Sequence, residues 1–193
     1  MRASDLRQAL EQHRLWSLSG GQDGRQFVGE NVDFGDVDLS AVDLAGAELP
    51  GASFRSGSLR GADLSNGNFA SARFVGTDLT GATLVKTDLD YAMFDSVKLI
   101  RANLRRASLI QASLVKADLD GADLRGADFE GADLTDAYLG GCLLDGTIFI
   151  ATKLLKAKLH GAIGAETARV TSIDIGRLVL GDAASQWLRS ESI

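Results

Sequence analysis

The sequence predicts an all-β solenoid, in which the chain winds into stacked coils made of short sides and corners. Two observations carry this prediction. Every fifth residue from Phe34 to Leu159 is Leu or Phe, at all 26 positions. Two residues before each of these, from Val32 to Ala157, the sequence has fifteen Ala, four Val, four Thr, two Gly and one Cys. No residue of this second series is larger than valine.

A period of five fits neither a helix nor a straight strand. Residues five apart lie on opposite faces of a strand and about 140° apart around a helix. The small residue and the Leu or Phe that follows it are two apart, so they share one strand face. The step of three to the next small residue demands a bend. Each five-residue unit is therefore a short side and a corner, and stacked coils turn the large side chains inward.

Residues 122–126, 127–131 and 132–136 read Ala-Asp-Leu-Arg-Gly, Ala-Asp-Phe-Glu-Gly and Ala-Asp-Leu-Thr-Asp. These units resemble the consensus of the pentapeptide-repeat family, which is Ala, Asp or Asn, Leu and two variable positions. The resemblance covers residues 30–163. It implies a right-handed, four-sided parallel β-helix with four units in each coil. The residues at the two ends add short helical caps to this prediction.

Residues 1–29 are predicted to form an N-terminal capping helix and a linker. Apolar and aromatic residues recur there with the spacing of an amphipathic helix, and Ser4 is a suitable N-cap. The residues that mark this face are Leu6, Ala9, Leu10, His13 and Trp16. The helix is expected to cover the open apolar end of the first coil.

Residues 164–193 are predicted to form a C-terminal cap or a dimerisation segment. Strand-like pieces lie within residues 170–180, and Asp182 is placed to begin a helix. In gyrase-associated members of the family a C-terminal helical segment makes a symmetric dimer. That resemblance implies a homodimer with Trp187 and Leu188 in the contact, and the alternative is a monomer whose tail folds back on the last coil.

Composition limits the classes of function. Twenty Lys and Arg stand against 26 Asp and Glu, giving a net charge of −6, so direct binding of nucleic acid is not expected. The single Cys142 excludes an internal disulfide and a multi-cysteine metal site, and reduced cytosol is the simplest location. Neither a secretory signal nor an 18-residue apolar run is present, so we expect a cytoplasmic protein that does not span a membrane. A bacterial source belongs to the leading hypothesis.

The sequence offers no catalytic constellation. His13 and His160 lie at opposite ends of the repeat, so they cannot form a local metal pair. Cys142 occupies an inward position of the repeat and is interpreted as a packing residue. We therefore predict a protein that is not an enzyme, with no catalytic residues, no cofactor and no metal.

Outward charges supply the candidate partner-binding residues. With four units per coil, Asp43 and Asp63 align with Asp123 on one side of the rod, and Glu48 and Asp88 align with Asp128 on the next. Such anionic columns can resemble duplex DNA. The alternative is that Asp and Asn serve as turn-forming and solubilising residues.

A basic cluster interrupts the acidic rod. Lys86, Arg105, Arg106 and Arg125 are expected to share one side, and no acidic residue occurs between Asp95 and Asp118. The cluster is either a solvated face or a docking site for an acidic partner. The favoured function is a protein-interaction or scaffold module. The second hypothesis is a DNA mimic that binds DNA gyrase or another type II topoisomerase, as in members of the family that confer resistance to topoisomerase poisons.

Overall fold

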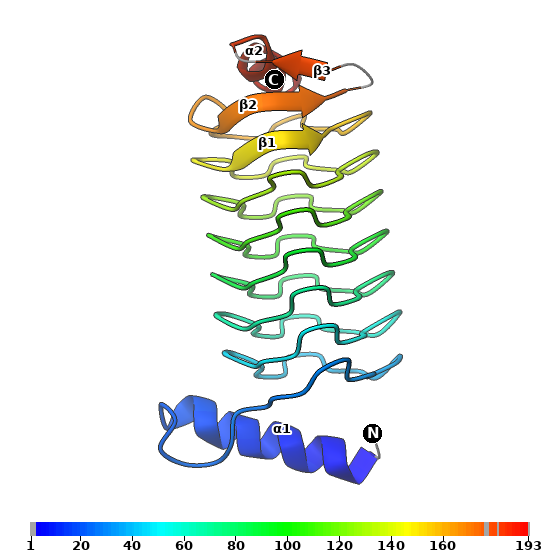
Figure 1. The fold of residues 1–193 in the computed structure, drawn as a ribbon, viewed down its shortest axis with the longest axis vertical. Coiled ribbons are helices and arrows are strands. Elements are labelled where there is room, and N and C mark those ends of the chain that lie inside the picture. The colour runs from blue at the N-terminus through cyan, green and yellow to red at the C-terminus, as the bar shows by residue number, and fades with distance from the viewer. Residues whose placement is uncertain (1–2, 176–177, 181, 193) are drawn as a thin grey trace.

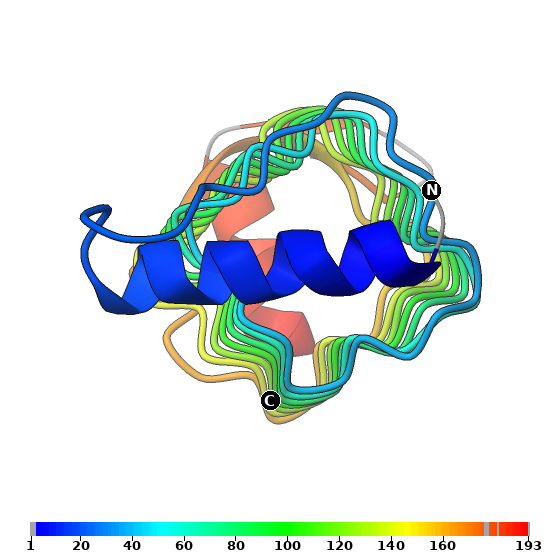
Figure 2. The same cartoon turned by 90° about the horizontal axis from the view of Figure 1, so that it is seen from below.

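The computed structural model describes residues 3–175, 178–180 and 182–192 and shows a rod of stacked coils (Figure 1). Parallel β-bridges join outward residues that are 20 positions apart, from the pair Val28 and Glu48 to the pair Leu143 and Ile163. A step of 20 residues equals four five-residue units, so each coil has four sides. Figure 2 shows the resulting outline, in which successive coils lie in register along the rod axis. The four-sided parallel β-helix predicted from the sequence is therefore confirmed.

Each side is hydrogen-bonded to the coils before and after it. The N–H of Leu44 donates to the carbonyl of Asp63 at 2.7 Å, and the N–H of Asp63 donates to the carbonyl of Val42 at 2.9 Å. Most sides are too short to form more than a single bridge. Longer strands occur only near the C-terminal end of the described chain, beginning with β1 (Ile148–Lys153).

Every corner contains one residue in the left-handed backbone region. From Ala41 to Gly161 each fifth residue has a φ between +53° and +74°, and 14 of these 25 residues are not glycine. At a representative corner the N–H of Ala47 donates to the carbonyl of Leu44 at 3.0 Å. A turn closed in this way, with positive φ at its third residue, is a type II turn. The corner after Phe34 differs, because its left-handed residue is Gly35.

The interior is a continuous apolar column. All 26 Leu and Phe residues of the repeat are buried, each at most 5% exposed. Four Phe residues that are 20 positions apart stack directly, with ring centroids 4.6–5.0 Å apart. These are Phe34, Phe54, Phe74 and Phe94. The hydroxyl groups of the inward threonines are hydrogen-bonded inside the rod. That of Thr77 donates to the carbonyl of Phe54 in the preceding coil at 2.6 Å.

Helix α1 (Ala3–Leu18) crosses the open end of the first coil (Figure 2). His13 is fully buried there, and its Nδ1 accepts the N–H of Phe27 at 2.9 Å. The imidazole also stacks on Trp16, with centroids 5.4 Å apart. The helix begins at Ala3, so the prediction of Ser4 as the N-cap was wrong, since Ser4 lies inside the first turn.

The C-terminal end is closed by a small sheet and a helix. Strand β1 pairs in parallel with β2 (Arg169–Asp174), and β2 pairs antiparallel with β3 (Leu178–Leu180). Helix α2 (Asp182–Glu191) follows (Figure 1). Leu188 is fully buried, and Trp187 is partly buried against the core. Both residues contact their own chain, and a homodimer through them stays a prediction.

We predict that Ala122→Leu destabilises the rod by about 1–3 kcal/mol, because overpacking strains a close-packed core. Ala122 is 0% exposed and faces the interior. The matched control is Ser65→Leu, which adds a large side chain at an outward corner position and should change the free energy of unfolding by less than about 0.5 kcal/mol. Urea denaturation measures both. Equal stability of the two variants would contradict the packing described.

A second prediction concerns the buried histidine of the N-terminal cap. Burial lowers the pKa of His13, and the nearby Asp43 carboxylate opposes this only in part. Neutral His13 accepts the Phe27 N–H, which an imidazolium cannot do. Because the folded-state pKa is below the unfolded value of about 6.5, the stability is present above that pH and is lost as the pH falls through the folded-state pKa.

The expected result is that the free energy of unfolding falls more steeply between pH 7.5 and pH 5.0 in the wild type than in His13→Leu. Urea denaturation at each pH gives the two profiles. The comparison removes the contribution of the carboxylates, which both proteins share. Parallel profiles would mean that His13 does not titrate with folding.

Candidate interaction surface

The residue before each buried Leu or Phe points outward, and these residues form one ladder on each side of the rod. We name each side after one member. The Arg73 side contains Asp33, Ser53, Arg73, Met93, Ser113, Asp133 and Lys153. The Asp78 side contains Asp38, Ser58, Asp78, Lys98, Asp118, Tyr138 and Lys158. The Asp63 side contains Asp43, Asp63, Thr83, Asn103, Asp123, Leu143 and Ile163. The Asp88 side contains Val28, Glu48, Asn68, Asp88, Ser108, Asp128 and Ile148.

Twelve Asp and Asn residues occupy these ladders between Asp33 and Asp133, and all twelve cap the corner that follows them. In each, Oδ1 accepts the backbone N–H two residues further on, at 2.9–3.3 Å. Side-chain oxygens of Asp and Asn form this bond readily in turns. Asn68 and Asn103 make it without a charge. Turn formation therefore accounts for these residues before any partner is considered.

The predicted acidic columns are aligned but not continuous. On the Asp63 side, Thr83 and Asn103 stand between Asp63 and Asp123, so only Asp43 and Asp63 are neighbours. Asp123 is also paired with Arg125, whose Nη2 lies 2.6 Å from Oδ2. The hydrogen bond from the Arg125 side chain lowers the pKa of Asp123, despite its partial burial.

The second column is interrupted in the same way. On the Asp88 side, Asn68 separates Glu48 from Asp88, and Ser108 separates Asp88 from Asp128. A continuous row of carboxylates one coil apart is therefore absent from this column.

The predicted basic cluster does lie at one corner, between the Asp63 and Asp88 sides. The N–H of Lys86 donates to the carbonyl of Arg105, and the N–H of Arg106 donates to the carbonyl of Arg125, so the four residues occupy adjacent coils. Arg125 is engaged by Asp123. No ion pair is formed by Lys86, Arg105 or Arg106 within the part of the chain that the structure describes.

Seven successive corners in the middle of the rod lack glycine, a feature that the sequence reasoning missed. We call them the corner band: Lys86, Tyr91, Ser96, Arg101, Arg106, Gln111 and Lys116, all with positive φ. The signal was present in the sequence as a fifth-residue series without glycine. Its meaning depends on knowing that this position is left-handed, where an L-residue other than glycine costs about 1 kcal/mol or more.

The long side chains of the band lie over the corners of the next coil. A Cβ added at Gly121 would be 3.4 Å from Cγ of Arg101, and one at Gly126 would be 3.5 Å from Cγ of Arg106. Glycine in the next coil therefore leaves room for these stems. The arrangement holds the side chains at the outer edge of the rod, where they contribute nothing to the apolar core.

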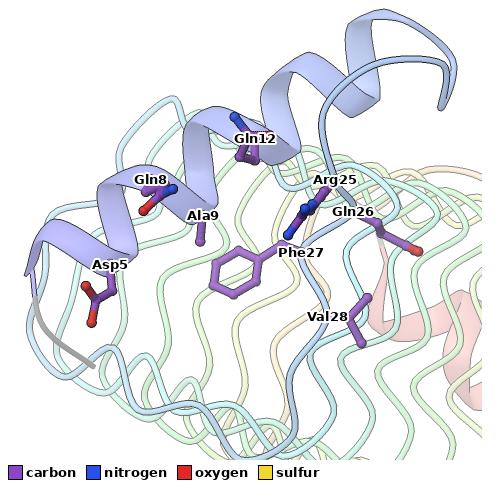
Figure 3. A pocket seen from close by; sticks show the side chains of 8 residues that line it. All are labelled: Asp5, Gln8, Ala9, Gln12, Arg25, Gln26, Phe27 and Val28. Atoms are coloured by element: carbon purple, nitrogen blue, oxygen red, sulfur yellow. The ribbon is translucent and has the colours of Figure 1, made fainter.

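One hollow of the surface lies beside helix α1. The pocket of about 330 Å³ between α1 and residues 25–28 is lined by Asp5, Gln8, Ala9, Gln12, Arg25, Gln26, Phe27 and Val28 (Figure 3). It has no histidine, cysteine or hydroxyl side chain. Among the described residues, no three His, Cys, Asp or Glu side chains gather in a way that could hold a metal ion. No helix in that part of the chain is long and apolar enough to cross a bilayer.

Comparisons with known proteins show which family the repeat resembles and which solved structures share its fold. The family described as pentapeptide repeats matches residues 33–163 in eight overlapping copies. No curated protein sequence shows significant similarity to the chain. The solved structure of trypsin-treated QnrB1, a plasmid-mediated fluoroquinolone resistance protein, matches with a TM-score of 0.64 and 16% identity over 78% of this chain and 76% of that one. Rfr23, a pentapeptide repeat protein from the cyanobacterium Cyanothece 51142, matches with a TM-score of 0.41 and 24% identity over 66% and 87% of the two chains.

The single thiol, Cys142, is predicted to be unreactive in the folded protein. Cys142 is 0% exposed, its Sγ lies 3.1 Å from the carbonyl of Leu119, and burial raises its pKa to about 12. A thiol that stays protonated and buried reacts slowly. We expect no labelling of the native protein by iodoacetamide at pH 8, and one label per chain in urea, measured by mass spectrometry. Native labelling at the unfolded rate would show that Cys142 is reactive.

Proposed function

The chain belongs to the pentapeptide-repeat family, and on that basis we propose that it is a non-enzymatic interaction module whose outward side chains bind a partner protein. The inward and outward positions of the rod have different roles. The Leu and Phe positions are apolar and buried along its length, whereas outward positions vary freely without disturbing the core. Side chains on such a scaffold are held at fixed spacings of about 4.8 Å along each side.

The observation that carries the proposal is the corner band. Glycine occupies 11 of the 25 left-handed corners from Ala41 to Gly161 but none of the seven from Lys86 to Lys116. Each such residue accepts a backbone cost that glycine avoids. Strained residues that gain nothing in packing point to a role in function. The band holds four cations and one tyrosine, and Arg and Tyr are enriched in protein interfaces.

The DNA-mimic hypothesis is supported by a single local feature. Asp43 and Asp63 are bridge partners, so two carboxylates lie one coil apart on the Asp63 side. The likeness to QnrB1 concerns the fold, since the identity is 16%. Interrupted columns and corner-capping carboxylates favour a structural role for the other acidic residues. Binding to a type II topoisomerase is therefore the second candidate.

The leading proposal predicts that replacing the four cationic residues of the corner band by glycine abolishes partner binding without lowering the free energy of unfolding. The band variant combines Lys86→Gly, Arg101→Gly, Arg106→Gly and Lys116→Gly. The matched control makes the same change at four corners outside the band: Asn66→Gly, Ser71→Gly, Asp136→Gly and Lys156→Gly. Affinity capture from a lysate of the cells that produce the protein, with quantitative mass spectrometry, compares the proteins retained by each form.

The expected result is a set of proteins retained by the wild type and the control but lost by the band variant, with a free energy of unfolding no lower than that of the wild type. A band variant that retains every partner of the wild type would refute the proposal. A band variant that unfolds more easily would show that the corner side chains serve stability instead.

The second candidate makes a different prediction. If the paired carboxylates mimic phosphates, the wild type should inhibit or protect DNA gyrase in a supercoiling assay, and Asp43→Lys with Asp63→Lys should abolish that effect. Asp38→Lys with Asp118→Lys, both on the Asp78 side, is the charge-matched control. An effect that survives the double reversal, or no effect of the wild type on gyrase, would remove this candidate.

A further inference from the structure

The two large apolar side chains most exposed in the middle of the rod lie close together in the sequence. Tyr91 is 62% exposed and Met93 is 41% exposed. Met93 belongs to the Arg73 side, and Tyr91 occupies the corner at which the chain enters that side. Their neighbours in the ladder and the corner column are polar, with Ser113 beside Met93 and Ser71 beside Tyr91. The result is a small apolar spot surrounded by polar groups, which is typical of a binding hot spot.

Within the corner band, Tyr91 is the residue whose presence at a left-handed corner is hardest to explain by the needs of the fold. Its φ is +60°, a conformation that is a genuine outlier for a bulky side chain. Asn, Asp and Gly enter this region most easily, and the corners of other coils use them. An aromatic ring kept in strained backbone and left mostly in water gains little for the fold. Contact with a partner would bury it.

A polar hollow lies on the same side, toward the N-terminal end. It has a volume of about 330 Å³ and is lined by Asn31, Asp33, Gly35, Gly51, Ser53, Arg55 and Arg73. The guanidinium groups of Arg55 and Arg73 form no ion pair with any residue that the structure describes. Asp33 is the one acid in the lining, and its Oδ1 accepts the N–H of Gly35. Two cations against one carboxylate leave the hollow with a charge of +1.

The hollow and the apolar spot are adjacent. Arg73 is the bridge partner of Met93, so the cation and the thioether are one coil apart. The stacked rings of Phe34, Phe54, Phe74 and Phe94 lie directly behind these residues. This column of aromatic rings makes the Arg73 side a rigid platform, which reduces the entropy lost on binding.

We propose that the Arg73 side binds an extended segment of a partner protein, with an acidic side chain placed between Arg55 and Arg73 and an apolar side chain placed on Tyr91 and Met93. The inference rests on the proposed function and names the partner chemistry. Side chains two apart in an extended segment are about 6.6 Å apart on one face. That spacing lies between the height of one coil and the height of two coils along the rod. An acidic residue can therefore reach Arg55 and Arg73 while an apolar residue two positions away contacts Tyr91 and Met93.

Charge favours a peptide over other anionic partners. The ladder of the Arg73 side carries Asp33 at one end and, toward the other, Asp133 paired with Lys153, and the whole chain carries −6. A duplex or an anionic bilayer would place phosphates over these carboxylates as well as over the arginines. A short acidic-apolar segment meets only the cations and the apolar spot.

The test is an NMR titration of the ¹⁵N-labelled full chain with three acetylated and amidated octapeptides in a Gly-Ser background. The first contains Glu-Ser-Leu, the second Gln-Ser-Leu and the third Glu-Ser-Ser. We expect the first peptide to shift the amides of residues 53–55, 73 and 91–93, and the other two to bind at least tenfold more weakly. Arg73→Gln and Tyr91→Gly should weaken the first peptide by a similar factor.

The matched control is Asn66→Gly, which makes the same change to glycine at a left-handed corner outside the corner band, between the Asp63 and Asp88 sides, and should bind the first peptide as the wild type does. Thermal unfolding of each variant confirms that it is folded, and Tyr91→Gly should be no less stable than the wild type. No shift on this side at millimolar peptide, or equal binding of the Gln-Ser-Leu peptide, would overturn the proposal.

Two further outcomes would overturn it in other ways. Shifts produced equally by inorganic phosphate and independent of Tyr91 would mean an anion site alone. Self-association that Tyr91→Gly abolishes, seen by sedimentation, would mean that a second copy occupies this side. The proposed function is tested separately: if the band variant loses its captured partners but Arg73→Gln retains them, the interaction module stands and this side is the wrong surface.

Discussion

The rest of the structure depends on one backbone constraint, which is that every fifth residue adopts the left-handed conformation. This corner turns the chain from one side of the four-sided coil onto the next, and it directs the next small residue toward the interior. It explains why glycine occupies 11 of the 25 corner positions from Ala41 to Gly161 and proline occupies none, because proline is fixed at negative φ. It also explains the Asp and Asn residues, whose side chains hold the N–H groups at the entry of the corner. Core, ladder and corner are therefore specified by the same five positions.

The constraint divides the surface into positions with different costs. A side chain on a ladder position, such as Met93, costs the backbone nothing, because any residue accepts an extended conformation. A side chain on a corner, such as Tyr91 or Arg106, is placed against the preference of the backbone. Ladder residues therefore tell little about function by themselves, whereas corner residues other than glycine, asparagine and aspartate are informative. The corner band and the Arg73 side meet at Tyr91, which makes that residue the most informative on the rod.

Most of the fold could be predicted from the sequence, because the step of five and the small residue before each Leu or Phe follow from sterics alone. The coil of four units needed the family resemblance, since a period of five fits any number of sides. The stack beginning with Phe34 and Phe54 was visible only after a step of 20 was known. His13 was placed on the covered face of the helix, but its full burial and its hydrogen bond with Phe27 could not be predicted, because they depend on the angle at which α1 crosses the first coil. The corner band was overlooked because a missing glycine has meaning only where the backbone requires positive φ.

The most direct test of this account compares the free energies of unfolding of two corner variants that make opposite changes, one that replaces a glycine and one that introduces a glycine. Gly81 has a φ of +68° and open space around an added Cβ, so Gly81→Ala changes the backbone preference and little else. Lys86 has a φ of +57°. The account predicts that Gly81→Ala lowers the free energy of unfolding by about 1 kcal/mol, whereas Lys86→Gly leaves it unchanged or raises it. A stable Gly81→Ala variant together with a destabilised Lys86→Gly variant would contradict the claim that corner side chains are kept at the expense of stability.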